Sequence, residues 1–360
     1  MKRGVPQAAV WAIGLAFGLA LAAGPAAAAE TTIKVGFCAR TISSAVAPYA
    51  IASKMGWFAE RGIKVEVVPL PGSTDCVKLV ATGDLPYSLP SMEPLAIIRA
   101  EGVKAKIFYT AYQGFNYGIA VPSDSPVKDV ADLKGKKIGV TSMASAGVIV
   151  ARAMVAMSGL DPDRDVHIVV AGEAAQTAAL LRSHQVDALS QFDVQYVLVE
   201  NAGVALRWLD REALRHYPSN GFLALEKTLA EHRDQAVALA RGYAMGTEFL
   251  FANPEAAIRI LYEEYPQSKP TGKDEATAIR DDLKALAARQ QDWRLEAGGV
   301  TRWGESNPKN FAAYIDFLLK WGVIKEKVAV DDIITNALID DINKFDAATV
   351  ENAARAYKAK

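Results

Sequence analysis

Short apolar runs alternate with amphipathic stretches along the first two thirds of the chain. The runs at 33–37, 63–68 and 137–141 are rich in Val and Ile and have the length of strands, and a polar loop and a helical pattern follow each of them. The same signals predict strands near 87–89, 106–112, 117–121, 166–170, 186–190 and 222–225. Strands that alternate with helices are typical of parallel sheets covered by helices, so we expect an α/β fold.

The pattern changes after Trp208. One more short strand precedes a C-terminal region in which nearly all apolar positions have helical spacing. The predicted helices of this region are 231–252, 254–265, 277–290, 308–320, 331–343 and 347–357. Its aromatic residues fit a core-facing stripe, so we interpret them as packing against the first α/β unit.

A weak internal repeat relates two parts of the α/β region. Residues 72–88 and 172–190 each read as a loop, a helix, a tight turn and a short strand that ends in a hydroxyl residue. Two similar lobes would produce this repeat, and so would the order of loop, helix and strand that all βα units share.

The stretch from Asp129 to Gly147 predicts a strand that is followed by a Ser- and Gly-containing turn at the start of a helix. A helix start offers unpaired backbone N–H groups and a partial positive charge, which suit an anion. An ordinary βα connection with Ser142 and Ser145 as helix caps explains the same residues.

The N-terminus has the layout of a secretory signal peptide. A basic start at Lys2 and Arg3 precedes an apolar run over 8–23 and a small-residue site at 27–29. A membrane anchor is the alternative, but the run is short for spanning. We expect residues 1–29 to be removed, which takes away two positive charges and changes the formal net charge from −1 to −3.

Composition excludes several partners. Lys+Arg number 40 and Asp+Glu number 41, so no basic excess favours nucleic acid or an anionic membrane surface. Cys38 and Cys76 are the two cysteines, and export permits a disulfide between them. Two free, half-buried thiols are the alternative.

No catalytic motif is present in the sequence. The four histidines lack metal-ligand spacing, and there is no dinucleotide-binding glycine motif, P-loop or Gly-x-Ser-x-Gly elbow. We therefore expect no enzymatic activity, no metal and no cofactor.

Several motifs together carry a family resemblance. Residues 54–62 read KMGWFAERG, residues 71–73 read PGS, and residues 129–140 read DVADLKGKKIGV. Together with the predicted signal peptide, these motifs resemble those of the periplasmic solute-binding proteins of ABC importers. The resemblance covers about residues 32–320. In particular the chain resembles the branch for aliphatic sulfonates, taurine, nitrate and thiamine-precursor pyrimidines.

The resemblance implies a two-lobed, type II-like binding protein with two hinge crossings and a helical C-terminal tail. Lobe 1 would comprise 32–119 and 221–360, and lobe 2 would comprise 122–218, with hinges near 120–122 and 218–220. It also implies a monomer in the periplasm that delivers its solute to an ABC permease and its ATPase.

Transfer by position in the pattern predicts the ligand-binding residues at the ends of strands and near the first hinge. They are Arg40, Ser43, Ser44, Ser73, Thr74, Ser88, Ser91, Phe115, Asn116, Tyr117, Thr141, Ser142, Ser145, Glu173, Phe192 and Asp193. The hydroxyls and Arg40 suit a small carboxylate, sulfonate or aromatic acid, whereas Glu173 and Asp193 favour a donor or cationic group. Arg40 could instead form an ion pair on the rim, and Asp193 could cap its helix.

Two other functions remain open at this point. One is a ligand sensor that acts on a membrane receptor and not on a transporter. The other is an enzyme resembling the pyrimidine-precursor synthesis protein of the same fold, whose Cys-rich, His-bearing site this chain lacks.

Overall fold

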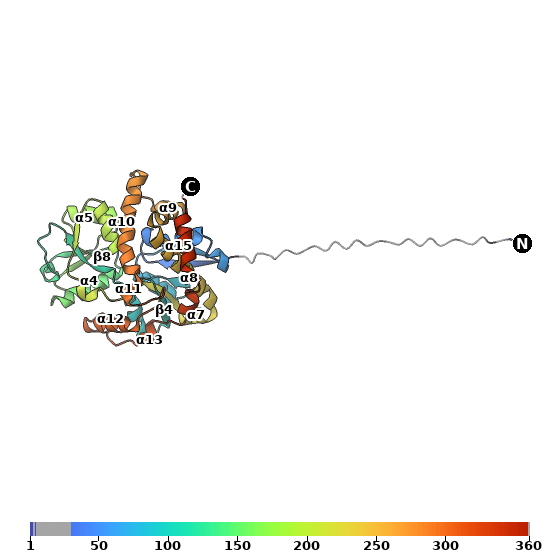
Figure 1. Cartoon of the computed structure of the whole chain (residues 1–360). Coiled ribbons are helices and arrows are strands. Elements are labelled where there is room, and N and C mark those ends of the chain that lie inside the picture. Colours follow the sequence, from blue (N-terminus) through green and yellow to red (C-terminus); the bar gives the residue numbers. More distant parts are fainter. Residues whose placement is uncertain (3, 5–29, 359–360) are drawn as a thin grey trace.

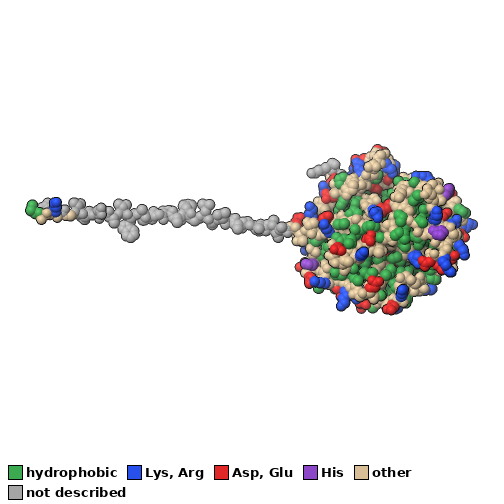
Figure 2. Space-filling view, turned by 180° about the vertical axis from the view of Figure 1, so that it is seen from behind, with side chains coloured by type: hydrophobic (Ala, Val, Ile, Leu, Met, Phe, Trp, Pro, Cys, Tyr) green, Lys and Arg blue, Asp and Glu red, His purple; other side chains and the backbone are tan. Residues whose placement is uncertain are grey.

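The computed structural model describes residues 1, 2, 4 and 30–358 (Figure 1). The predicted signal peptide at 1–29 therefore lies almost wholly outside the described residues. Within the described part of the chain, no helix is both long enough and apolar enough to cross a membrane. On the face seen in Figure 2, acidic and basic side chains are intermingled, in keeping with the balanced composition.

The first sheet has the strand order β2-β1-β3-β10-β4. Its strands are β1 (Thr31–Phe37), β2 (Ile63–Pro69), β3 (Tyr87–Ser88), β4 (Ala105–Thr110) and β10 (Gly221–Leu225). β1 pairs in parallel with β2 and β3, so that Val35 lies opposite both Val67 and Tyr87. Only β10 runs antiparallel to its neighbours.

The second sheet has the order β7-β6-β8-β5-β9. Its strands are β5 (Tyr117–Pro122), β6 (Lys137–Val140), β7 (His167–Val170), β8 (Ala188–Phe192) and β9 (Leu206–Trp208). β6 is parallel to β7 and β8, and β5 is antiparallel to β8 and β9. In both sheets the antiparallel strand is the one that follows a crossing between sheets.

The chain crosses from the first sheet to the second between β4 and β5, and returns between β9 and β10. The sequence placed the first crossing near 120–122, but Ala120 and Val121 pair with β8 and β9 inside the second sheet. The crossing thus lies at 111–116, because a local strand pattern cannot tell which sheet the strand joins. The two crossing segments lie side by side, since Asn220 O accepts from the amides of Ala111 (3.0 Å) and Tyr112 (2.9 Å).

Helices cover both sheets. Those of the α/β region are α1 (Ala47–Lys54), α2 (Ser73–Ala81), α3 (Glu93–Arg99), α4 (Ala146–Met157), α5 (Ala174–Arg182) and α6 (Asp193–Asn201). The C-terminal region adds α7 (Glu226–Glu231), α8 (Arg233–Ala252), α9 (Pro254–Glu264), α10 (Glu275–Trp293), α11 (Leu295–Gly298), α12 (Pro308–Lys320), α13 (Val330–Ile333), α14 (Ile339–Ile342) and α15 (Ala347–Ala356). Single 3-10 turns lie at Ser44–Val46, Ala59–Arg61, Val130–Leu133, Glu212–Leu214 and Pro266–Ser268.

The predicted helix over 331–343 is wrong. The structure has the short helices α13 and α14 there, separated by an extended segment. Ile334 forms a parallel bridge with Ile107 of β4, and Thr335 N donates to Ile107 O at 2.9 Å. Pairing with the exposed edge of β4 therefore replaces the central turn of the expected helix.

Helix α10 lies between the two α/β units in Figure 1. It begins where Asp274 accepts a hydrogen bond from Thr277 N, and one face buries Ala278, Leu286 and Trp293. α10 packs on α9 beside the first sheet and on α6 beside the second. It therefore spans the boundary at which a site between the sheets would lie.

A candidate ligand cleft between the two sheets

Loops from the two sheets meet across a cleft. Glu173, which precedes α5, accepts from the backbone amides of Arg40 (3.2 Å) and Thr41 (3.1 Å) in the β1–α1 loop. Parallel strands of each sheet end at this cleft, as is usual for binding sites of α/β proteins. The carboxylate of one unit therefore docks on the backbone of the other.

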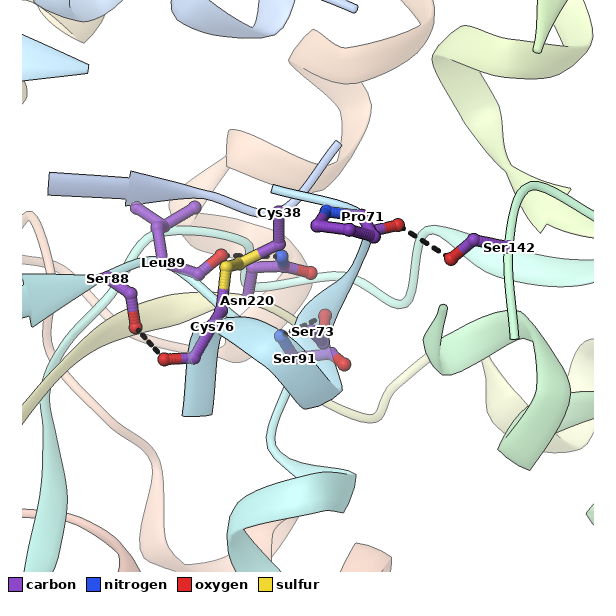
Figure 3. Close-up of a disulfide and its surroundings, with 9 residues drawn as sticks. All are labelled: Cys38, Pro71, Ser73, Cys76, Ser88, Leu89, Ser91, Ser142 and Asn220. Atoms are coloured by element: carbon purple, nitrogen blue, oxygen red, sulfur yellow. Dashed lines mark hydrogen bonds between the residues drawn. A yellow bond between two sulfur atoms is a disulfide. The ribbon is translucent and has the colours of Figure 1, made fainter. Parts of the chain in front are cut away.

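A second set of contacts seals the cleft beside α2. Ser142 Oγ donates to Pro71 O at 2.7 Å (Figure 3), and Thr74 N donates to Ala144 O at 3.0 Å. These bonds join the loop after β2 to the loop after β6. The structure therefore has the two units closed on each other.

Gly72 allows the backbone of the loop after β2 to lie directly against the backbone of the loop after β6. A Cβ at this position would lie 2.4 Å from Ala144 O and 2.6 Å from Ser145 N. Real Cβ atoms are not found so close to backbone atoms, so no other residue allows the same closure.

The closed units leave a small cavity between them. It is lined by Phe37, Cys38, Ala39, Ala45, Leu89, Tyr112, Asn116, Tyr117, Phe192, Asn220 and Arg289. Its volume of about 20 Å³ has room for a water molecule, but not for an organic solute. A solute can enter only if the units separate or the lining side chains move.

One wall of the cavity carries a buried ion pair. Arg289 of α10 is 2% exposed and Asp193 at the start of α6 is 5% exposed. Arg289 Nε donates to Asp193 Oδ2 at 2.9 Å, and Nη2 donates to Oδ1. The guanidinium also lies 4.2 Å from the centroid of the Tyr112 ring and 5.8 Å from that of Phe192. A forked pair of this kind fixes the guanidinium in one orientation.

Arg289 was not among the residues predicted from the sequence. Its only sequence signal is a charged residue in register with Ala285, Leu286 and Trp293 on the apolar face of a helix. Such a residue needs a partner, but nothing local shows that the partner is Asp193.

Asp292 lies one turn further along α10 and is 8% exposed. Burial, and secondarily the charge of Asp193, raise the pKa of Asp292 to about 8. The guanidinium groups of Arg289 and Arg211 oppose this rise. Burial therefore favours the protonated form of the Asp292 carboxyl.

The first crossing segment holds Asn116 in the cavity wall. Asn116 Oδ1 accepts from Ser219 Oγ at 2.5 Å, and Asn116 O accepts from Asp193 N at 3.0 Å. Asn220 Nδ2 donates to Leu89 O at 2.9 Å (Figure 3). Both crossings are therefore tied to the cavity by polar contacts.

The structure brings part of the predicted set together. Asn116, Tyr117 and Phe192 line the cavity, and Asp193 reaches it through Arg289. The rim contains the residues at which the two units meet, namely Arg40, Thr74, Ser142 and Glu173. Contact of these residues with a ligand stays a prediction.

The other predicted residues have structural roles or lie apart from the cavity. Ser145 Oγ accepts from Gly147 N and caps α4, Ser73 Oγ accepts from Ser91 N, and Ser88 Oγ donates to Cys76 O (Figure 3). Phe115 packs on Tyr314 of α12, away from the cavity. Ser43 precedes a 3-10 turn, Ser44 is the buried first residue of that turn, and Thr141 is buried directly after β6.

The two cysteines form a disulfide in the structure. Cys38 and Cys76 have Cα atoms 5.9 Å apart, and the bond ties the β1–α1 loop to the first turn of α2 (Figure 3). Cys38 also lines the cavity. The alternative of two free thiols does not hold.

Within the described residues, no group of three or more His, Cys, Asp and Glu side chains could hold a metal ion.

Known proteins resemble this chain in sequence and in fold. A family model described as NMT1/THI5 like matches residues 43–257. The chain belongs to the NMT1/THI5-like family. Among relatives of this family member, the riboflavin-binding protein RibY of Chloroflexus aurantiacus is 24% identical over 296 residues, which are 81% of this chain and 82% of RibY. The nitrate/nitrite binding protein NrtA of Nostoc sp. is 22% identical over 366 residues, which cover 89% of this chain and 78% of NrtA.

The fold of this family member is also that of solved binding proteins. The alkanesulfonate-binding protein SsuA from Xanthomonas axonopodis pv. citri superposes with a TM-score of 0.62 at 18% identity, covering 86% of this chain and 99% of SsuA. The predicted two-lobed periplasmic binding protein fold and the predicted sulfonate- and nitrate-type family are thereby confirmed.

Proposed function

We propose that this chain is an exported solute-binding protein that captures a small organic solute between its lobes. In the periplasm it delivers the solute to an ABC permease, which works with its ATPase, and it catalyses no reaction. The named relatives support this role, since each is a binding protein for a small molecule or ion.

The observation that carries the proposal is a buried guanidinium beside aromatic rings. Arg289 lies in the cavity wall, and Tyr112, Tyr117 and Phe192 line the same cavity. Asp193 accepts from Nε and from one N–H of Nη2, so the proposed donors to carboxylate or sulfonate oxygens are Nη1 and the second N–H of Nη2, and the rings favour a flat apolar body. The proposed ligand is therefore a carboxylate, a sulfonate or an aromatic acid.

The two crossings are the proposed hinges. Residues 111–116 and 209–220 connect the sheets, and hydrogen bonds join the two segments at Tyr112 and Asn220. Bending there would separate the lobe containing the first sheet and the C-terminal helices from the lobe containing the second sheet. It would break the Glu173, Ser142 and Thr74 contacts and open the cavity.

The proposal is tested by identifying the natural ligand. Protein purified from its native periplasm is denatured, and the released compounds are identified by mass spectrometry. An intact organic acid that rebinds to the refolded protein supports the proposal. Conversion of that compound by the protein, or the release of cations alone, would contradict it.

A matched pair of variants tests the assigned residue. Arg289→Lys keeps the charge but loses the forked donor geometry, so affinity for the released acid should fall about tenfold or more. Arg280→Lys, at an exposed position of the same helix, is the control and should bind as the wild type does. Equal affinity of all three proteins would remove Arg289 from the site.

A further inference from the structure

One disulfide lies between the two loops through which the lobe of the first sheet meets the lobe of the second sheet. Cys38 is two residues before Arg40, whose amide donates across the cleft to Glu173. Cys76 is two residues after Thr74, whose amide donates to a carbonyl of the other lobe. The bond between the cysteines therefore joins the loop of one cross-cleft contact to the loop of the other (Figure 3).

Hydrogen bonds do not hold these two loops together. The parallel pairing of β1 with β2 ends where Leu70 N donates to Phe37 O at 2.8 Å. Beyond that bond, residues 38–43 have no regular secondary structure. Among the described residues, each loop forms hydrogen bonds with other parts of the protein, but no hydrogen bond joins 38–43 to 71–76. The disulfide therefore joins the loops beyond the point where the β-ladder ends.

The Cys76 end of this link is fixed in the first sheet. Cys76 is fully buried in the first turn of α2, and its carbonyl accepts from Ser88 Oγ of β3 at 3.1 Å (Figure 3). β3 lies between β1 and β10 in the sheet. Cys38 is half-buried, and the disulfide holds its Cα atom 5.9 Å from that of Cys76. The disulfide thus fastens an irregular loop to a helix that is itself bonded to the sheet.

The same loop forms part of the cavity wall. Cys38 and Ala39 line the cavity together with Arg289, and all three belong to the lobe of the first sheet and the C-terminal helices. Phe192, which also lines the cavity, comes from the second sheet. A shift of the loop would therefore change both the cavity wall and the contact with Glu173.

We propose that the Cys38–Cys76 disulfide positions the β1–α1 loop for solute capture, so that both cross-cleft contacts form in a single closing movement. This inference rests on the proposed function and assigns the disulfide an effect on affinity besides its effect on folding. With the link in place, the loop moves together with α2 as the lobes close. Without the link, the loop samples other conformations, and the entropy lost in ordering it opposes closure.

The size of the effect follows from the contacts at the tip of the loop. Glu173 accepts from Arg40 N at 3.2 Å and from Thr41 N at 3.1 Å on an exposed rim. Contacts of this kind are weak, so a loop that no longer reaches Glu173 should lower solute affinity about fivefold to tenfold. The two loop amides should exchange their protons with solvent faster by a similar factor.

The first experiment needs no solute. Amide hydrogen exchange is followed residue by residue by NMR in the wild type, in the double variant Cys38→Ser/Cys76→Ser and in wild-type protein reduced after folding. Exchange at Arg40 and Thr41 should be about fivefold to tenfold faster in both altered forms. The reduced protein supplies the comparison even if the double variant does not fold. Equal exchange rates at these two amides in the wild type and in the reduced protein would overturn the inference.

Two further comparisons separate positioning from general stabilisation. Val350→Ala removes buried contacts of α15 and lowers overall stability, but it should leave exchange at the loop amides unchanged. A double-mutant cycle tests whether the disulfide acts through Glu173. Glu173→Gln should speed exchange at the loop amides about fivefold in the disulfide-bonded protein, and by less than about twofold in the reduced protein. Additive effects, or exchange in Val350→Ala as fast as in the reduced protein, would overturn the inference.

A binding measurement keeps this inference separate from the proposed function. Benzoate, an aromatic acid, is titrated by calorimetry into the wild type, the reduced protein and Val350→Ala. Affinity should be equal in the wild type and Val350→Ala, and about fivefold to tenfold lower in the reduced protein. Equal affinity in all three would overturn the inference and leave the proposed function intact. Failure of benzoate to bind the wild type would count against the proposed ligand class, and the exchange rates would still decide the role of the disulfide.

Discussion

Replacing Gly72 with alanine tests whether the lobes must meet through their backbones. Gly72 has extended dihedral angles (φ 171°, ψ −179°), which alanine adopts without strain, so the effect comes from the methyl group alone. That methyl carbon would lie 2.4 Å from Ala144 O. Since van der Waals contact needs roughly 3.5 Å, the lobes would have to separate by about 1 Å at this point.

The cost of this separation can be worked from the adjacent hydrogen bonds. The Ser142 Oγ to Pro71 O distance of 2.7 Å and the Thr74 N to Ala144 O distance of 3.0 Å would each grow by about 1 Å, which is beyond hydrogen-bond range. Each bond contributes about 0.5–1.5 kcal/mol, so closure loses about 1–3 kcal/mol. Affinity should fall about 5-fold to 150-fold.

Two measurements separate closure from folding. Calorimetry with the released natural ligand gives the affinity, and small-angle X-ray scattering gives the radius of gyration with and without ligand. Gly72→Ala should bind weakly and stay expanded, with a melting temperature close to that of the ligand-free wild type, while Lys78→Ala on the exposed side of α2 should behave as the wild type. Wild-type affinity together with wild-type compaction on binding would refute the reasoning.

Three further predictions concern other contacts. Glu173→Gln weakens the acceptor of two loop amides on a solvent-exposed rim, so ligand affinity should fall only about fivefold. Calorimetry measures this affinity, and an unchanged value would show that the contact does not hold the lobes together. Replacing Cys38 and Cys76 with serine opens a link over a separation of 38 residues and should lower the free energy of unfolding by about 4 kcal/mol in urea titrations, whereas an equal midpoint of unfolding would argue against the bond. Burial raises the pKa of Glu93, whose carboxyl bonds the Tyr314 hydroxyl, so the folded state holds a proton there that the unfolded chain releases above its ordinary pKa. Wild-type stability should therefore decline as pH rises above about 4.5 toward that raised pKa; Glu93→Gln should lose part of this decline in melting curves, and parallel curves would contradict it.

The fold was largely predictable because its signals are local. Strand length, helical spacing and the turns marked by Gly and Pro depend on residues that are near each other in the chain. These signals predicted nearly every strand and helix of the α/β region. The exceptions share a cause. Ile334 leaves a helical pattern to pair with β4, and Ala120 joins the second sheet; both choices depend on strands distant in sequence.

The candidate site divides in the same way. The loop after a strand that pairs in parallel indicated Phe192 and Asp193, because parallel strands bring such loops to one edge of a sheet, whereas Asn116 and Tyr117 were predicted from their place near the first hinge. The hydroxyl residues were less informative, since Ser145 caps its own helix and Ser73 bonds Ser91. A serine near a helix start fits both roles equally well in the sequence.

The sequence by itself determined that this is an α/β chain of the binding-protein type, with its loops gathered at strand ends. Only the tertiary structure decided that Arg289, from the C-terminal helices, lies in the cleft. Its partner Asp193 is 96 residues away in the chain, and the packing of α10 against α6 brings the two together. Local patterns carry no record of such packing, because the charge that stabilises Arg289 comes from an element whose position is set by the whole fold.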